Sequence, residues 1–339
     1  FGSLLFNFYR INGHNPIQSN WEVLHYAALT VPYLSEGAVR QLSGSLKNEC
    51  DYTVQSVSKM LYPNTEKYFP VQESISDGIQ KDQFIEKHFY HANTFLRVQE
   101  GKLHILENVL ESKKIHFKKL SSKTLVCAGN FPLTDLPEYT QGIFEIQDIA
   151  SQSVAAFLHP AANEVWWDCC CGSGGKSILL LEKERDIQLY ASDVRESILN
   201  NFQMRMQRNN YGKVNIVQAD LENTNCNISV IPGCDGIIAD VPCSGSGTWG
   251  RTPEWLHFFN ADLLKTYSAR QRRIVKTILT KLKRGGVLVY LTCSVFKEEN
   301  EKNISFFTDT MPLQLKQMQY LQYSDLKADT LFLAELIKV

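Results

Sequence analysis

The chain has 339 residues, of which 44% are hydrophobic, and this fraction is typical of a globular protein with a sizeable core rather than of a disordered chain. Its formal net charge of -1 provides no overall attraction to nucleic acid or to an anionic membrane, so a site for a polyanion must depend on a local patch. The nine cysteines, three of them consecutive at Cys169 to Cys171, suit neither a disulfide ladder nor a paired zinc site, and we expect a reducing, cytoplasmic compartment.

The apolar stretches of the chain are short. None approaches the length needed to cross a bilayer, and the first residues, FGSLLFNFYRINGHNP, are too often interrupted by polar residues for a signal peptide. We therefore expect no membrane partner, and we expect a monomer.

Residues 1–92 are predicted to form a helical N-terminal region. From Trp21 to about Lys87 apolar residues recur at intervals of three and four, as in WEVLHYAALTVPYL and YTVQSVSKMLY, which is typical of amphipathic helices. His88 and His91 are spaced to share one face of a helix, but no thiol or further histidine near them completes a ligand set. We therefore predict no metal site.

The pattern of apolar residues changes at residue 93, and residues 93–140 are predicted to form a small, RNA-recognition-like α/β unit. A short strand in NTFLRV precedes a helix from about Gly101 to Ser112, and the basic run SKKIHFKKL then leads into the apolar segment TLVCAGNF. The lysines of this run, which include Lys118 and Lys119, are interleaved with apolar residues. Both a solvated face and a contact with RNA phosphates fit such a run.

Residues 141–339 alternate between apolar runs of strand length and helical stretches. The strands expected from this pattern are EVWWDCC, QLYASD, VNIVQAD, CDGIIADVP and GVLVYLTC. Strands buried on both faces and joined by helices form a mostly parallel, doubly wound α/β sheet, which here is Rossmann-like. In such a sheet ligands bind at the carboxyl ends of the strands.

A glycine-rich turn, DCCCGSGGKS over residues 168–177, follows the first of these strands and opens a helix. Glycines let the backbone turn sharply and approach a ligand, while the helix N-terminus offers unpaired N–H groups. The turn matches neither the phosphate loop GxxxxGK[ST] nor the dinucleotide fingerprint GxGxxG. Alone it is compatible with a dinucleotide, a phosphate or S-adenosylmethionine.

Three aspartates accompany this turn at the ends of successive strands. Asp193 ends the second strand and suits a ribose diol, Asp220 ends the third, and Asp240 ends the fourth. Carboxylates in this register fit a nucleoside that carries a sulfonium and an amino acid better than they fit a pyrophosphate. Any one of them could instead cap a helix.

Two cysteines also stand at strand ends: Cys243 in DVPCSGSGTWGRTPEW and Cys293 in VLVYLTCSVFKEEN. Carbon 5 of a pyrimidine is too poor a nucleophile to accept a methyl group from a sulfonium unless a thiolate first adds at carbon 6. A second group must then remove the carbon 5 proton. Two thiols at neighbouring strand ends could share these tasks.

These motifs resemble those of the Nol/Nop/Sun family of RNA cytosine-5 methyltransferases, bacterial rRNA type. The resemblance runs from about Phe95 to the end and is strongest from Gln147 onward. It rests on the segments FEIQDIASQ, DCCCGSGGKS, DVPCSGSGTWGRTPEW, RQRRIVKTILTKLKRGGVLVYLTCSVFKEEN and DTLFLAELIK, which keep the family's order and rough spacing.

The resemblance implies a role for each motif. Cys293 would be the nucleophile, Cys243 would assist product release, and Asp240 would lie against the N3 edge of the base. Arg251, close after Cys243, is a candidate contact to a phosphate or base. The residues expected to bind S-adenosylmethionine are Cys170, Cys171, Gly172, Ser173, Gly174, Gly175, Lys176, Asp193, Asp220 and Asp240.

The glycine turn departs from the family's usual Cys-Ala-Ala-Pro-Gly-Gly-Lys, because Cys171, Gly172 and Ser173 stand in the Ala-Ala-Pro places. We therefore expect a more flexible turn. Where family members often carry an arginine, five positions after the ribose aspartate, this chain has Ile198, with Arg195 nearby, and we assign neither a cofactor contact.

The resulting hypothesis is an S-adenosylmethionine-dependent RNA (cytosine-5) methyltransferase that acts on 16S rRNA, with tRNA as the alternative substrate. A DNA cytosine-5 methyltransferase would use the cysteine of the Pro-Cys stretch and leave Cys293 unexplained. An amino-group methyltransferase needs no thiol. The alternative from another class is an RNA-binding scaffold of the same fold that has lost its chemistry.

Overall fold

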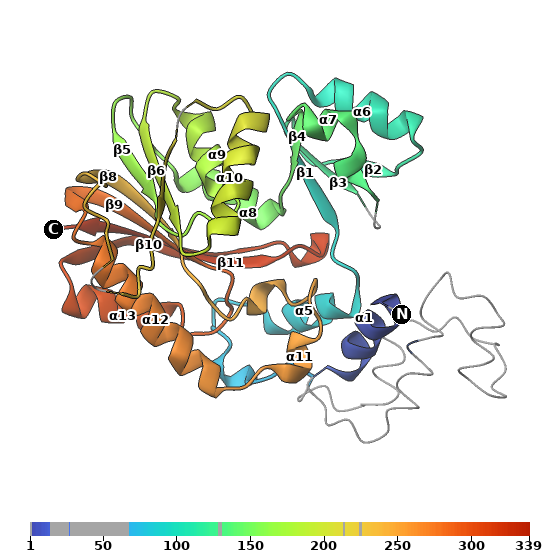
Figure 1. Cartoon of the computed structure of the whole chain (residues 1–339). Coiled ribbons are helices and arrows are strands. Elements are labelled where there is room, and N and C mark those ends of the chain that lie inside the picture. The colour runs from blue at the N-terminus through green and yellow to red at the C-terminus, as the bar shows by residue number, and fades with distance from the viewer. Residues whose placement is uncertain (1, 14–26, 28–67, 128–130, 213, 224–225) are drawn as a thin grey trace.

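The computed structural model describes residues 2–13, 27, 68–127, 131–212, 214–223 and 226–339 (Figure 1). Most of the helical stretch predicted between Trp21 and Lys87 lies outside these residues. Two described helices belong to the N-terminal region, α1 (Gly2–Asn12) and α5 (Lys81–Glu86). None of the described helices is long and apolar enough to span a membrane.

A four-stranded antiparallel sheet, in the order β2-β3-β1-β4, forms the small α/β unit. Its apolar face packs on α6, where Leu96 and Leu125 of the sheet and Leu106 and Leu110 of the helix are fully buried. The last strand lies beyond residue 140, where the sequence pattern placed the end of this unit. The elements are β1 (Thr94–Val98), α6 (Leu103–Ser112), β2 (Phe117–Lys119), β3 (Thr124–Cys127), α7 (Pro137–Thr140) and β4 (Phe144–Ile146).

A seven-stranded sheet, in the order β10-β11-β9-β8-β5-β6-β7, forms the second unit. The five strands predicted from the apolar runs are all present and pair in parallel: β5 (Val165–Asp168), β6 (Gln188–Asp193), β7 (Asn215–Gln218), β8 (Cys234–Asp240) and β9 (Leu282–Thr292). The sequence pattern did not single out the last two strands, β10 (Leu313–Gln322) and β11 (Thr330–Lys338), which pair antiparallel. The predicted α/β, mostly parallel Rossmann-like fold is confirmed.

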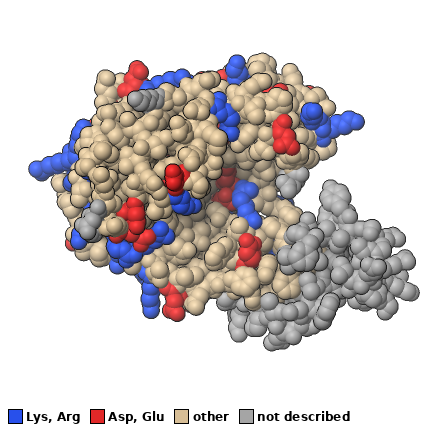
Figure 2. Space-filling view, in the orientation of Figure 1, with Lys and Arg blue, Asp and Glu red and all other residues tan. Residues whose placement is uncertain are grey.

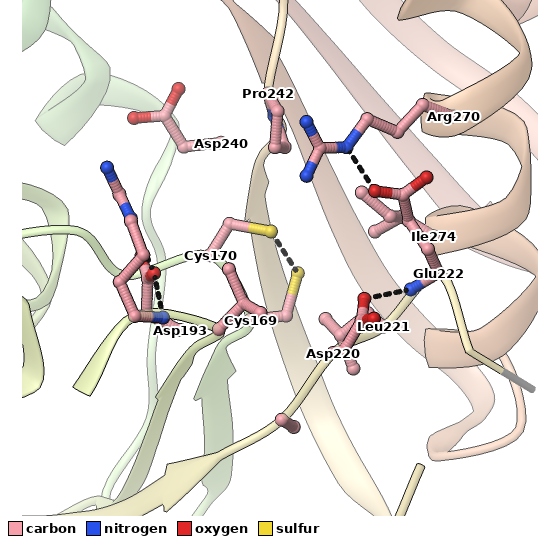
Figure 3. A pocket seen from close by; sticks show the side chains of 13 residues that line it. Cys169, Cys170, Asp193, Asp220, Leu221, Glu222, Asp240, Pro242, Arg270 and Ile274 are labelled. Atoms are coloured by element: carbon pink, nitrogen blue, oxygen red, sulfur yellow. Dashed lines mark hydrogen bonds and ion pairs between the residues drawn. The ribbon is translucent and has the colours of Figure 1, made fainter. Parts of the chain in front are cut away.

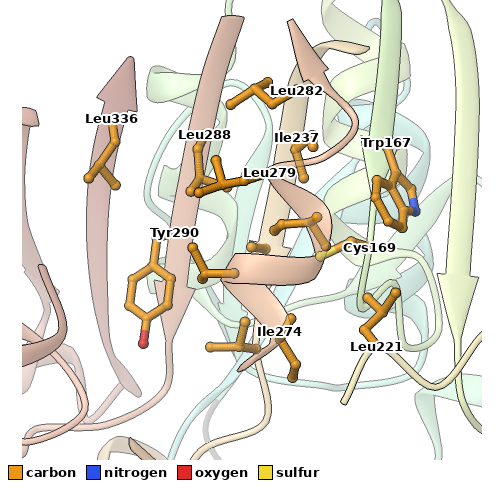
Figure 4. Close-up of a cluster of buried hydrophobic side chains, with 14 of the residues drawn as sticks. Trp167, Cys169, Leu221, Ile237, Ile274, Leu279, Leu282, Leu288, Tyr290 and Leu336 are labelled. Carbon is orange, nitrogen blue, oxygen red and sulfur yellow. The ribbon is translucent and has the colours of Figure 1, made fainter. Parts of the chain in front are cut away.

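Helices cover both faces of this sheet, and each face has its own core. On one face Ile274 and Leu279 form one buried cluster with Leu288 and Ile237 of the central strands (Figure 4). The helices of this face are α12 (Asp262–Ile278) and α13 (Glu301–Thr310), and those of the other face are α8 (Ile149–Ser153), α9 (Gly175–Lys183) and α10 (Glu196–Arg208). Because both faces are buried, the central strands are apolar throughout, as the sequence pattern predicted.

Buried polar contacts join the small α/β unit to the larger sheet. Glu145 of β4 forms ion pairs with Arg205 and Arg208 of α10, at 2.8 and 2.6 Å. Arg97 of β1 donates to Gln147 and forms an ion pair with Glu182 of α9. The carboxylate of Glu145 is therefore fully compensated, and its neighbouring arginines lower its pKa although burial alone would raise it.

The N-terminal region packs on the loops that follow β8 and β9. Phe69 stacks on Trp249, which in turn packs against Phe259, and these rings form one buried cluster with Phe84 and Phe296. A short helix, α11 (Trp255–Phe258), contacts α1 at the edge of this cluster. Through these contacts the N-terminal region covers one side of the loop that carries Cys243.

The backbone of Gly236 in β8 lies directly against the ring of Trp166 in the neighbouring strand. An added Cβ at this position in β8 would lie 2.5 Å from ring atoms of Trp166 in β5, whose ring is almost fully buried. We expect Gly236→Ala to lower the free energy of unfolding by about 1–3 kcal/mol, because the ring has no room to move. Denaturation in urea measures the change. Gly250→Ala is the matched control, since nothing lies within 4 Å of its Cβ position, and equal destabilisation of both variants would contradict this packing.

Candidate functional site

The predicted site residues gather at the carboxyl ends of the parallel strands. β5, β6, β8 and β9 are neighbours in the sheet and run in the same direction, so the turns after them open on one edge. Figure 3 shows the cavity at this edge, and its volume is about 340 Å³. It is lined by Cys169, Cys170, Asp193, Val194, Arg195, Ala219, Asp220, Leu221, Glu222, Asp240, Pro242, Arg270 and Ile274.

Three carboxylates of the cavity are those predicted from the strand ends. Asp193, Asp220 and Asp240 all line it, together with Cys170 (Figure 3). The predicted turn residues Cys171 to Lys176 do not line this cavity. They adjoin it, because the backbone N–H of Gly172 donates to Asp193, a lining residue, at 3.2 Å. The cavity thus has an acidic rim with the glycine turn along one side.

The glycine turn has a backbone that only glycine adopts easily at two positions. Gly172 and Gly174 have φ angles of 50° and 90°, in the left-handed region that disfavours residues with a Cβ. An added Cβ at Gly174 would also lie 2.7 Å from Met206 and 2.8 Å from Phe202 of α10. Helix α10 therefore packs directly under the turn.

Polar contacts hold the turn as well. Arg205 of α10 donates through Nη1 to the carbonyl oxygen of Ser173 at 3.3 Å and to its hydroxyl at 2.9 Å. The side chain of Gln147, next to β4, donates to the carbonyl of Gly175 at 3.4 Å. The sequence led us to expect a more flexible turn because Ser173 stands where proline is usual, and these hydrogen bonds supply a different restraint.

The acidic rim includes partners that the sequence did not indicate. Arg195 donates to both carboxylate oxygens of Asp193, at 3.0 and 3.2 Å, and these bonds lower the pKa of Asp193 although burial would raise it. Arg270 of α12 forms an ion pair with Glu222 on the side of the cavity away from Asp193 (Figure 3). A helix rich in arginine, RQRR, was visible in the sequence, but only the fold shows that one of these side chains reaches the cavity.

Lys176 and Asp240 connect the glycine turn to the loop after β8. The ammonium group of Lys176 lies 2.7 Å from Asp240, and both side chains are largely buried. Burial lowers the pKa of Lys176, but the charges of Asp240 and Cys293 outweigh it and raise this pKa above its ordinary value. A fixed positive charge therefore lies beside Cys293.

The two predicted thiols are in contact. The backbone N–H of Cys293 donates to the sulfur of Cys243 at 3.2 Å. The pKa of the Cys243 thiol is raised well above its ordinary value by a side-chain hydrogen bond with the Cys293 thiol and by burial. Gly247, in the loop after β8, lies close to the backbone of Cys293 and of Thr330. Its N–H donates to the carbonyl of Cys293 at 2.8 Å, and a Cβ at this position would collide with the carbonyl of Thr330.

The predicted RNA contacts lie in different environments. Arg251 is engaged with the protein itself, since its guanidinium pairs with Asp148 at 2.7 Å and with Asp329 at 3.0 Å. Lys118 and Lys119 are exposed on β2 of the small unit, and Figure 1 shows β2 on the other side of the view from β8 and β9. Their roles toward RNA stay predictions.

Charged side chains on the face seen in Figure 2 alternate in sign, with both acidic and basic groups around the central hollow. Among the described residues no group of three or more His, Cys, Asp or Glu side chains is arranged to hold a metal ion. Cys169 and Cys170 lie with their sulfurs 4.0 Å apart, and the former is buried in the core.

Comparison with known proteins gives relatives of one kind. Residues 155–332 match the family model described as 16S rRNA methyltransferase RsmB/F. Over 192 residues the chain is 35% identical to ribosomal RNA small subunit methyltransferase B of Shewanella oneidensis, covering 56% of this chain and 44% of that protein. The protein of the same name from Xanthomonas campestris is 35% identical over 179 residues, which cover 52% of this chain and 40% of that protein. This chain therefore spans less than half of the length of these curated relatives.

Solved structures share the fold. A methyltransferase homologue from Pyrococcus horikoshii superposes with a TM-score of 0.65 at 22% identity, covering 85% of this chain and 96% of that one. NSun6 from the same organism gives a TM-score of 0.67 at 17% identity, covering 77% and 94%. The family match covers more than half of the chain and contains the glycine turn and both cysteine loops, and the chain therefore belongs to the family of 16S rRNA methyltransferases RsmB/F.

Proposed function

We propose that this protein is an S-adenosylmethionine-dependent RNA (cytosine-5) methyltransferase whose substrate is small-subunit rRNA. The observation that carries the proposal is the contact between Cys243 and Cys293 at adjoining strand ends, beside the Lys176–Asp240 ion pair. Two thiols facing one site are required for attack at carbon 6 and for proton removal at carbon 5, whereas a scaffold without chemistry would not need them. The names of the curated relatives support rRNA over tRNA.

The residues of the cavity fit S-adenosylmethionine. Its sulfonium and ammonium groups are positive, and the cavity offers the carboxylates of Asp193, Asp220 and Asp240. In this proposal Asp193 accepts from the ribose diol, and the open space beside Gly172 lets the backbone approach a nucleoside. When bound, this cofactor supplies an electrophilic methyl group.

The protein's own residues then divide the remaining work. Cys293 adds to carbon 6 of the cytosine as a thiolate, and the electron pair of the carbon 5–carbon 6 double bond becomes available at carbon 5. Asp240 contacts the N3 edge of the base, and Lys176 keeps this carboxylate in place. After carbon 5 has been methylated, Cys243 removes its proton, the double bond re-forms, and Cys293 leaves as a thiolate.

The separate roles of the two thiols predict different behaviour of their alanine variants. Cys243→Ala should form the carbon 6 bond but release it slowly, so turnover falls by at least about 100-fold and RNA stays covalently attached. Cys293→Ala should neither turn over nor retain RNA. The measurement incubates each variant with unmodified 16S rRNA transcript and labelled S-adenosylmethionine, and separates protein from RNA on a denaturing gel.

A tRNA transcript mixture, tested in parallel, separates the two substrate classes. Retention of RNA by Cys293→Ala instead of Cys243→Ala would show that the roles are reversed. Full turnover by both variants would refute covalent catalysis by these thiols.

The contact between Arg205 and the glycine turn predicts a change in cofactor affinity. Arg205→Ala removes the hydrogen bonds to Ser173, and we expect S-adenosylhomocysteine to bind about 2- to 10-fold more weakly, the range for one hydrogen bond. Isothermal titration calorimetry measures the dissociation constant.

Arg208→Ala is the matched control for this variant. Arg208 shares the partner Glu145 with Arg205 but makes no contact with Ser173 among its described hydrogen bonds. The control should bind the ligand as the wild type does. Equal weakening in both variants would assign the effect to Glu145 and the packing of the small unit rather than to the turn.

A further inference from the structure

Each of the two cysteines is followed by a serine, and both serines bond to the same carboxylate oxygen. The hydroxyl of Ser244, next to Cys243, donates to Oε2 of Glu299 at 2.5 Å. The hydroxyl of Ser294, next to Cys293, donates to the same Oε2 at 2.5 Å. One atom of Glu299 therefore joins the loop after β8 to the loop after β9.

The other oxygen of Glu299 completes this network. Its Oε1 accepts from the backbone N–H of Ser244 at 2.9 Å and from the carboxamide of Gln271 at 3.0 Å. The same carboxamide nitrogen lies 3.0 Å from the carbonyl of Pro242, the residue before Cys243. Glu299 thus holds the residue after Cys243 directly, and it holds the residue before Cys243 through Gln271.

Glu299 is fully buried, and the partners described above are hydroxyls, an amide N–H and a carboxamide rather than a lysine or arginine. Burial raises its pKa, which its hydrogen bonds from the serines partly oppose. A buried carboxylate without a cation is costly to keep. Packing alone would be served by an apolar side chain, so the geometry that Glu299 imposes on the two loops is the better explanation for it.

We propose that Glu299 is a positioning residue that ties the Cys243 and Cys293 loops together and so sets the spacing and orientation of the two sulfurs. This inference deepens the proposed function and rests on it, because the two thiols must act on the same base. Glu299 itself does not touch the substrate position; it acts through the two serines.

The charge of Glu299 also distinguishes the two thiols. It contributes to the raised pKa of Cys243, after the hydrogen bond with Cys293, burial and the charge of Cys293. On the other side of the pair, Lys176 places a positive charge near Cys293. The further titratable groups that face Cys243 are Tyr267 of α12 and Tyr290 of β9.

The test uses Glu299→Gln, which keeps the size of the side chain and removes its charge. Alkylation by iodoacetamide is followed against pH, and mass spectrometry of the peptides reports Cys243 and Cys293 separately. Removing a negative charge favours the thiolate, so the profile of Cys243 should move to lower pH. With 16S rRNA transcript, kcat should fall by about 10- to 100-fold, as for one or two buried hydrogen bonds left unmade, with little change in KM.

Glu298→Gln is the matched control, because Glu298 is the adjacent carboxylate and pairs with Lys302 at 2.7 Å. It should leave the alkylation profiles and kcat unchanged. If Glu299→Gln does not fold, a Ser244→Ala, Ser294→Ala double variant releases the same loops and should show the same loss of kcat.

Unchanged alkylation and unchanged kcat in Glu299→Gln, or in the double variant where only that one folds, would overturn the proposal. Alkylation needs neither RNA nor cofactor. In the double variant the charge of Glu299 remains, so a changed alkylation rate of the two cysteines there reports their geometry. Such a change in a protein that methylates no RNA would support the role of Glu299 in positioning the thiols and contradict the proposed function alone.

Discussion

The parallel pairing of β8 with β9 is the constraint on which the site depends. Asp240 lies opposite Leu291 in this register, so the two strands end within a few residues of one another. The loop after β8 carries Cys243 and Ser244, and the loop after β9 begins with Cys293 and Ser294. Because the strands are central and buried on both faces, this register cannot slip without exposing the core. The contact between the two sulfur-bearing loops is therefore a property of the whole sheet.

Opposite charges on either side of the thiol pair make chemically similar groups unequal. Lys176 comes from the glycine turn and lies near Cys293, whereas Glu299 comes from the segment after β9 and lies near Cys243. A thiolate is favoured beside a cation and disfavoured beside an anion. The raised pKa of Cys243 suits a group that accepts a proton, which is the role proposed for it above.

Much of this arrangement could be predicted from the sequence, because strand ends are legible in apolar runs. The runs that end at Asp193 and Asp240 predicted that these carboxylates would meet at one edge, and they do. Pairings between distant polar residues were not predictable. Glu299 stands in FKEEN beside another glutamate, and no local pattern distinguishes the buried carboxylate from its partly exposed neighbour. Arg251 shows the same limit, since its partners Asp148 and Asp329 come from distant segments.

The small α/β unit is linked to the glycine turn through the side chains of Arg205 and Gln147. Glu145 of β4 holds Arg205, and Arg205 holds Ser173 in the glycine turn. Gln147, just beyond β4, reaches the same turn at Gly175 while accepting from Arg97 of β1. A shift of β4 would therefore move donors away from the turn that adjoins the acidic cavity. The exposed lysines of β2 lie at the opposite edge of the same four-stranded sheet from β4, so the surface proposed for RNA and the strand that supports the turn belong to one sheet.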